Sequence, residues 1–198
     1  EHLMFFPPTA PEGDTEIWAS WRPHTDDDFG WQTPVNLGPD INTVVRDEGP
    51  AYFAGEDTSP PTLFFVSNRP GGLGLLDVYA SERQPEGSFG TPTHVSELSS
   101  PSRDARPTIR YDGLEVILFS NRPDESGNFD FDLWGSTRTS LGSTWATPEN
   151  LGMTVNSGAS DIQPQLSSDA EMLQFGADRD GGYGNLELYV TVRSKGGQ

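Results

Sequence analysis

Three segments of the chain repeat one another at a fixed spacing, and this repeat constrains the fold more than any other feature. Each begins with the pattern Asp-x-x-Pro, continues into a β-rich run, and then reaches a polar turn that contains an arginine. The three starting segments are Asp47–Pro50, Asp104–Pro107 and Asp161–Pro164, with successive aspartates 57 residues apart. A period of this length with four short strands per unit is typical of a β-propeller blade.

The repeat predicts one all-β domain over residues 1–198: a β-propeller of about four four-stranded blades, incomplete at both ends. The first unit lacks its innermost strand (A), and the last stops before its outermost strand (D). In the second unit we expect strands at Pro50–Phe53, Thr62–Ser67, Asp77–Glu82 and His94–Leu98. The approximate blade units are residues 1–46, 47–103, 104–160 and 161–198.

A second motif recurs between the third and fourth strands of the units. It places an aromatic residue two positions before Thr-Pro, at Trp31–Pro34, Phe89–Pro92 and Trp145–Pro148. Large rings at a repeated position favour packing, so we expect these side chains to fill the space between neighbouring blades.

The chain is strongly acidic, with 30 acidic and 12 basic residues and a net charge of −18. Such a surface repels nucleic acid and anionic lipid, so we expect no nucleic-acid partner and no membrane insertion. There is no cysteine, which excludes disulfides and thiolate chemistry. The 22 glycines and 17 prolines favour frequent turns over long helices.

The arginine turns carry a family resemblance. Ser67–Pro70 and Ser120–Pro123 both read Ser-Asn-Arg-Pro, and they are followed by Asp77-Val78-Tyr79 and Asp132-Leu133-Trp134. This pattern resembles the WD40-like PD40 repeat of TolB-type propellers, found in the periplasmic TolB and in many bacterial secreted or envelope proteins. The resemblance implies a propeller in a bacterial periplasmic or secreted protein. The third copy departs from the pattern at Asp178-Arg179-Asp180, and the first lacks it at Pro7–Ala10.

Candidate ligand-binding residues follow from blade geometry, because the loops before the innermost strands converge at the mouth of the central channel. We expect six side chains there: Asp47, Glu48, Asp104, Arg106, Asp161 and Gln163. An aspartate before a strand also accepts backbone N–H groups, so a structural role is the alternative. Hairpin neighbourhood predicts that each turn arginine pairs with the acidic residue that opens the next strand, as Arg69 with Asp77.

No catalytic motif is present. The three histidines, His2, His24 and His94, lie away from the predicted channel mouth, and no nucleophile elbow or phosphate loop occurs. The sequence therefore favours a non-catalytic binding module for a peptide, glycan or protein. Two alternatives stay open: a carbohydrate-active hydrolase or lyase using the channel-mouth carboxylates, and a structural scaffold within a longer propeller.

Metal binding is the weakest signal. Asp178 and Asp180 stand in a Gly-rich turn, where short-spaced oxygen ligands suit Ca²⁺. No other cofactor is expected. If the propeller is incomplete, a homo-oligomer is a further expectation.

Overall fold

The computed structural model describes residues 2–6, 15–55 and 59–193, and this part of the chain is built from strands and loops without a helix. The strands form four separate antiparallel sheets. No helix long and apolar enough to cross a membrane occurs among the described residues. The predicted all-β architecture is therefore confirmed.

The four sheets follow one another along the chain, and neighbouring strands within each are consecutive in sequence. The first sheet contains β1 (His2–Phe6), β2 (Trp18–Arg22) and β3 (Val35–Asn36). The second contains β4 (Asp47–Phe53), β5 (Thr62–Ser67), β6 (Asp77–Glu82) and β7 (Thr93–His94). The third contains β8 (Asp104–Ile109), β9 (Glu115–Ser120), β10 (Asp132–Thr137) and β11 (Glu149–Asn150), and the fourth contains β12 (Asp161–Leu166), β13 (Met172–Ala177) and β14 (Glu187–Val192).

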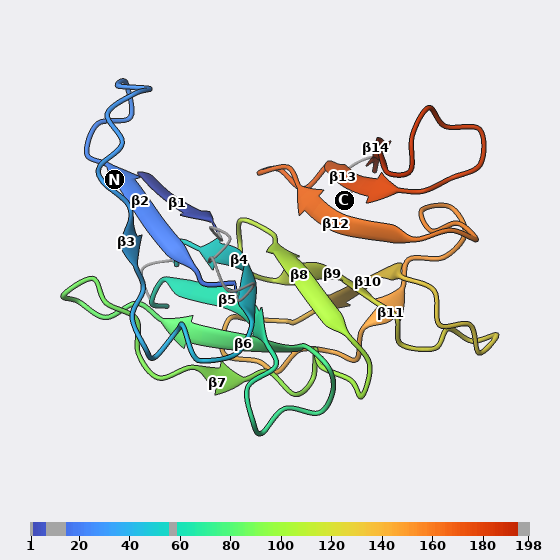
Figure 1. Cartoon of the computed structure of the whole chain (residues 1–198), viewed down its shortest axis with the longest axis horizontal. Coiled ribbons are helices and arrows are strands. Elements are labelled where there is room, and N and C mark those ends of the chain that lie inside the picture. The colour runs from blue at the N-terminus through green and yellow to red at the C-terminus, as the bar shows by residue number, and fades with distance from the viewer. Residues whose placement is uncertain (1, 7–14, 56–58, 194–198) are drawn as a thin grey trace.

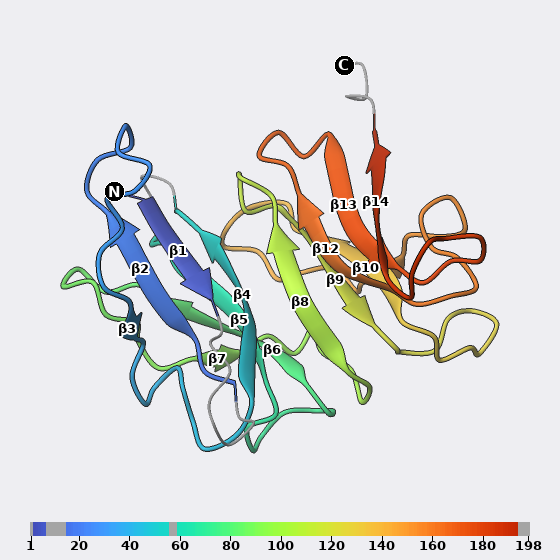
Figure 2. The ribbon, with the colours of Figure 1, turned by 45° about the horizontal axis from the view of Figure 1, so that its top comes forward.

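The sheets stand side by side in an arc, with β4, β8 and β12 along its inner side (Figure 1). β1 contacts β4, β4 contacts β8, and β8 contacts β12, whereas β1 and β12 share no contact within the described residues. The second view shows the same separation of the two end sheets (Figure 2). The architecture is that of an incomplete β-propeller.

The hydrophobic core is divided among the three interfaces between successive sheets. Residues on each strand alternate between the two faces, so one strand supplies side chains to two interfaces. On β5, Leu63 and Phe65 face the first sheet, whereas Phe64 and Val66 face the third. Ile117 and Phe119 of β9 continue the series toward the fourth sheet. A sheet covered on both faces in this way explains the nearly unbroken apolar run of β5.

Two of the three recurrent aromatic residues lie in these interfaces, as the sequence predicts. Trp145 packs against Phe64 with ring centroids 6.4 Å apart, and Phe89 packs against Phe5 at 6.1 Å. Both of these plug residues, Trp145 and Phe89, are buried, whereas Trp31 in the first sheet is only half-buried. Phe89 thus links the second sheet to the first, and Trp145 links the third sheet to the second.

The inner strands begin earlier than the sequence suggested. β4, β8 and β12 start at the aspartates rather than at the prolines three residues later. The pairing register of each shifts by a bulge that contains the proline, between Glu48 and Ala51 in β4 and at the matching places in β8 and β12. Proline is tolerated because a bulge removes the need for its missing N–H.

Candidate ligand-binding face

Each Asp-x-x-Pro aspartate is buried and held by the same set of donors. Asp104 has no exposed surface, and its Oδ2 accepts the backbone N–H of Ser100 at 2.6 Å and the Ser100 hydroxyl at 2.8 Å. Its Oδ1 pairs with Arg122 Nη2 at 2.5 Å. The other two carboxylates repeat this geometry: Asp47 with Thr43 and Arg69, and Asp161 with Ser157 and Arg179.

The partner of the turn arginines differs from the one that the hairpin rule predicts. Arg69 pairs with Asp47 at 2.8 Å and not with Asp77. The Asp77 carboxylate instead turns into its own Gly-rich loop, where it accepts the N–H groups of Leu73 and Gly74. The prediction of a cross-strand pair was therefore wrong, because backbone donors of the loop satisfy the strand-opening acid first.

The same correction applies to the other two units. Arg122 pairs with Asp104 and not with Asp132, whose Oδ2 accepts from Asn150. Arg179 pairs with Asp161, while the Glu187 carboxylate accepts the N–H groups of Tyr183 and Gly184. The Ser-Asn-Arg turn and the Asp-x-x-Pro segment therefore form one structural unit across the first two strands of a blade.

The turn arginines are further held by carbonyls and rings. Arg69 donates to the carbonyl of Ile41, and its guanidinium carbon lies 5.0 Å from the Phe65 ring centroid and 4.9 Å from that of Tyr79. Burial between rings strengthens the attraction of the guanidinium for its carboxylate partner. We assign the aspartates a structural role, and their direct contact with a ligand stays a prediction.

The third position of each Asp-x-x-Pro segment has left-handed backbone geometry. Its φ values are 62° at Gly49, 46° at Arg106 and 56° at Gln163. Glycine adopts this region freely, whereas other residues are strained by about 1–2 kcal/mol. The bulge imposes the same left-handed conformation on three different residues. The strain at Arg106 and Gln163 therefore comes from the fold, whereas the fold does not require these particular side chains.

Gly49 also stands where two sheets approach closely. A Cβ atom at this position would lie 3.1–3.3 Å from Arg106 Cγ, Cα and N. The third positions of β4 and β8 are therefore direct neighbours at the inner side of the arc. Arg106 is half-buried there, and Gln163 is exposed.

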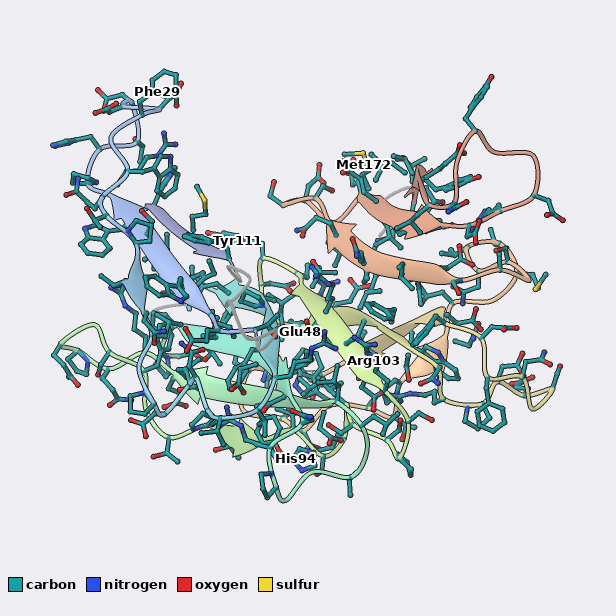
Figure 3. All side chains as sticks on the ribbon, in the orientation of Figure 1. Phe29, Glu48, His94, Arg103, Tyr111 and Met172 are labelled. Atoms are coloured by element: carbon teal, nitrogen blue, oxygen red, sulfur yellow. The ribbon has the colours of Figure 1, made fainter. Side chains whose placement is uncertain are left out.

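Glu48 is nearly buried and connects the second sheet to the third. Its carboxylate lies 3.5 Å from Arg46 Nε and 3.3 Å from Arg103 Nη2. Figure 3 places Glu48 and Arg103 together between β4 and β8. Of the predicted site residues, Glu48 is thus engaged in an ion pair that spans two blades.

Arg106 differs from the other described arginines because its guanidinium has no hydrogen bond or ion pair within the described part of the chain. Gln163, at the matching position of β12, likewise has no side-chain hydrogen bond among the described residues. The six predicted residues therefore fall into three groups. Three are aspartates, each held in a clamp by an arginine and a hydroxyl residue; one is a paired glutamate; and two, Arg106 and Gln163, are polar side chains without a partner among the described residues.

The calcium candidates do not converge with other ligands. No group of three or more acidic or histidine residues is gathered for a metal ion within the described residues. Asp178 and Asp180 flank Arg179, which pairs with Asp161. A calcium site in this turn stays a prediction.

One sequence signal for the clamp was overlooked. A hydroxyl residue stands four positions before each aspartate, as Thr43, Ser100 and Ser157. In each case its N–H and hydroxyl both reach the carboxylate, which closes a tight loop at the strand start. The pattern Ser/Thr-x-x-x-Asp-x-x-Pro would have identified the carboxylates as structural.

Comparison with known proteins supports the fold. No family model and no curated protein matches the chain. Among solved structures, it is similar to a TolB from Agrobacterium tumefaciens with a TM-score of 0.58 and 14% identity, covering 96% of this chain and 57% of that one. It is also similar to TolB from Acinetobacter baumannii (TM-score 0.54, 12% identity, 97% and 41% covered).

Enzymes of propeller fold are matched equally well. An α-L-arabinofuranosidase from Lactobacillus brevis has a TM-score of 0.61 and 14% identity, with 96% of this chain and 68% of that chain covered. A thermostable family-43 glycoside hydrolase has a TM-score of 0.60 and 13% identity, with 98% and 73% covered. The chain therefore has the fold of a TolB-like propeller, spans about half the length of the TolB structures, and shares that fold with glycoside hydrolases.

Proposed function

We propose that the chain is a non-catalytic binding module whose channel-mouth face holds an acidic group of a peptide, glycan or protein partner. The observation that carries this proposal is Arg106, whose guanidinium lies at the inner side of the arc without a partner among the described residues, in a protein of net charge −18. With so many carboxylates available, an arginine without a carboxylate partner is free to accept one from a ligand. Such a charge-assisted pair is among the strongest polar contacts that proteins make.

The backbone at Arg106 adds to the argument. The matched residue of the second sheet is glycine, which would relieve the strain of a φ of 46°. A long charged side chain at such a position is typical of functional sites, where local strain is compensated by the surrounding structure. Gln163, exposed at the matching place on β12, would offer amide donors and acceptors beside it.

The total charge restricts the kind of ligand. A polyanion would be repelled by the −18 surface, whereas a single carboxylate would pair locally with Arg106 at little long-range cost. We therefore propose a partner with one acidic group in an otherwise neutral or basic surface, such as a peptide carboxylate or one uronic acid unit.

The geometry does not favour the hydrolase alternative. Glycoside hydrolysis needs two carboxylates in different environments, one of them able to donate a proton. Asp47, Asp104 and Asp161 are all fully buried, and each is bound by one arginine and one hydroxyl residue. Such equivalent carboxylates supply neither an accessible nucleophile nor an acid. In line with the TolB-like fold, we further propose a periplasmic or secreted bacterial location.

The experiment compares Arg106→Gln with Arg22→Gln, whose arginine pairs with Asp28 in a loop of the first sheet. Peptide and glycan arrays that contain acidic and matched neutral probes would identify a ligand, and calorimetry would measure its affinity. We expect Arg106→Gln to weaken binding about 10- to 100-fold, the range of a hydrogen bond to a charged group, with Arg22→Gln unaffected. Turnover of a polysaccharide panel by the wild type, abolished in a folded Asp104→Asn variant, would replace the binding module with the enzyme.

A further inference from the structure

An arginine recurs near the end of the third strand of every sheet, six residues after an acidic residue: Arg22, Arg83, Arg138 and Arg193. Two of these arginines are anchored in the same way. Arg138 Nε donates to the carbonyl of Gly113 at 2.8 Å, and Arg193 Nε donates to that of Ala170 at 2.7 Å. Gly113 and Ala170 are 57 residues apart, which is one repeat. The two guanidinium groups are therefore placed alike, each against the sheet before it.

In the interface between the third and fourth sheets, the guanidinium meets a buried carboxylate. Arg193 Nη1 lies 2.7 Å from Oε1 of Glu115, and Nη2 lies 2.6 Å from Oε2. Glu115 is the first residue of β9 and is buried. Hydrogen bonding to this carboxylate raises the pKa of the Arg193 guanidinium. The arginine of the fourth sheet thus has a complete anionic partner on the third.

The interface between the second and third sheets has a threonine at the matching place. Thr62 is the first residue of β5, as Glu115 is of β9, and each stands five residues before the serine of a Ser-Asn-Arg turn. A hydroxyl group carries no charge, so Thr62 cannot form the ion pair that Glu115 forms. The second sheet therefore presents no carboxylate to Arg138 at this position.

The guanidinium of Arg138 keeps one free edge. Its Nη1 donates to the carbonyl of Leu141 in its own loop at 3.0 Å, and its carbon lies 4.4 Å from the Trp145 ring centroid. Its Nη2 has no hydrogen bond or ion pair within the described residues. Burial lowers the pKa of this guanidinium, and no described carboxylate offsets the effect. Arg138 is thus a half-buried cation that lacks an anion.

A cavity of about 640 Å³ lies beside Arg138, between the second and third sheets. Thr62 and Glu82 line it on the second sheet, and Arg138, Leu141 and Trp145 line it on the third. Its volume is in the range of sites for small molecules. The space that a glutamate at position 62 would occupy is therefore open to a group from outside the chain.

The charges of the lining indicate what kind of group fits. Glu82 is the cross-strand neighbour of Thr62, and such neighbours have Cβ atoms about 5 Å apart. Its carboxylate is exposed and has no partner within the described residues. The other acid of the lining, Glu97, accepts from the Ser96 hydroxyl at 3.3 Å. With two acids and one arginine, the cavity disfavours a simple anion and favours a ligand that carries both charges.

This cavity is separate from the channel-mouth face. His94 of β7 also lines it, and Figure 3 shows His94 apart from Glu48 and Arg103, which lie between β4 and β8. Binding in the cavity is therefore independent of Arg106.

We propose that the cavity binds a free α-amino acid, whose carboxylate pairs with Arg138 and whose ammonium group pairs with Glu82. The carboxylate takes the place before Arg138 that Glu115 takes before Arg193. The short separation of the two charged groups in an α-amino acid matches the adjacent positions of Thr62 and Glu82. Leu141 and Trp145 form the apolar wall for the amino acid's own side chain. Both contacts are charge-assisted hydrogen bonds, which are the strong class in proteins.

The first test is calorimetric titration of the chain with the neutral L-amino acids. Each is compared with its amide, which lacks the carboxylate, and with its N-acetyl derivative, which lacks the ammonium group. We expect one or more free amino acids to bind and both derivatives to bind at least about 10-fold more weakly. Arg138→Gln should weaken binding to a similar extent, whereas Arg106→Gln should leave it unchanged.

The sharper variant is Thr62→Glu, which supplies from the second sheet the carboxylate that Arg138 lacks. We expect it to weaken amino-acid binding at least about 10-fold and to raise the melting temperature by about 2–4 °C. Arg138 and Trp145 stay in place in this variant, so a loss of binding with a higher melting temperature cannot come from unfolding. Thr33→Glu is the matched control, because it adds the same charge at an exposed threonine of the first sheet. It should change neither quantity.

The outcomes decide the proposal. Absence of binding by every amino acid of the panel would overturn it. Binding to the Thr62→Glu chain as tight as to the wild type would do the same, because the ligand would then lie elsewhere. Equal affinity for an amino acid and its amide would remove the role of Arg138. Acetate bound as tightly as the amino acids would replace the zwitterion by a simple anion, against the charge of the lining.

Discussion

The first and third positions of the Asp-x-x-Pro segment lie two residues apart, yet they differ in every physical respect. The first is aspartate in all three sheets, fully buried and saturated with donors. The third is Gly49, Arg106 or Gln163, with one left-handed backbone and three different side chains. Identity across repeats thus marks what each blade needs to fold. A constrained backbone with a variable side chain marks the positions at which we propose that a ligand binds.

The largest expected effect is on the first position. Asp104→Ala leaves Arg122 without its carboxylate at a site where the arginine side chain is 11% exposed. Removing one partner of a buried pair costs about 3–5 kcal/mol, which urea unfolding would measure. Arg122→Ala and the double variant complete a mutant cycle. A loss below about 1 kcal/mol for Asp104→Ala would show that the clamp does not support the fold.

The next largest effect is expected at Gly49, where β4 approaches β8 closely. Gly49→Ala adds a Cβ 3.1–3.3 Å from Arg106 in a left-handed backbone of φ 62°, so we expect a loss of about 1–2 kcal/mol. Gly38→Ala is the matched control, because its φ is 82° and nothing lies within 4 Å of the added Cβ. The cost in excess of the control measures the contact between the two sheets, and a smaller cost at Gly49 than at Gly38 would refute that contact.

The sequence predicted the blades because their signals are local. Turns, apolar strands and plug aromatics are each readable within a few residues, and the repeat reports them three times. The pairing of Arg69 was mispredicted for the opposite reason. Its true partner, Asp47, lies 22 residues earlier on a neighbouring strand, whereas the Asp77 carboxylate is captured by loop N–H groups that the sequence alone does not orient.

The six candidate residues were predicted as one group, and only the structure separates them by burial and pairing. Burial separated the aspartates from Arg106 and Gln163, and burial depends on how successive sheets pack. The bulge that gives Arg106 and Gln163 positive φ angles also lacks a signal in their own identities, since neither residue favours that region. Only Gly49, at the matching position, pointed to it.

Asp132 is an acidic residue outside the three clamps, and its effect on stability should depend on pH. Asp132 is buried, its Oδ1 has no partner among the described residues, and burial followed by nearby acids raises the pKa of this carboxyl. Because the folded pKa lies above the unfolded one, ionised Asp132 lowers stability at neutral pH. Asp132→Asn should therefore stabilise the protein by about 1 kcal/mol at pH 7. The gain should shrink as pH falls from the folded toward the unfolded pKa, and a gain independent of pH would contradict this origin.

The smallest expected change in stability is at Arg106. Its sign distinguishes the third position of the segment, where we expect a gain, from the first position, where we expect a loss. Arg106→Gly relieves the strain of a φ of 46°, but it also increases the entropy of the unfolded chain, so the net gain in stability is about 0.5 kcal/mol. Gln163→Gly should show the same small gain, since its φ is 56°. In the binding assay the two variants should diverge, with Arg106→Gly losing the acidic ligand and Gln163→Gly losing less. A clear loss of stability in Arg106→Gly would mean that its side chain supports the fold, as the neighbouring aspartate does.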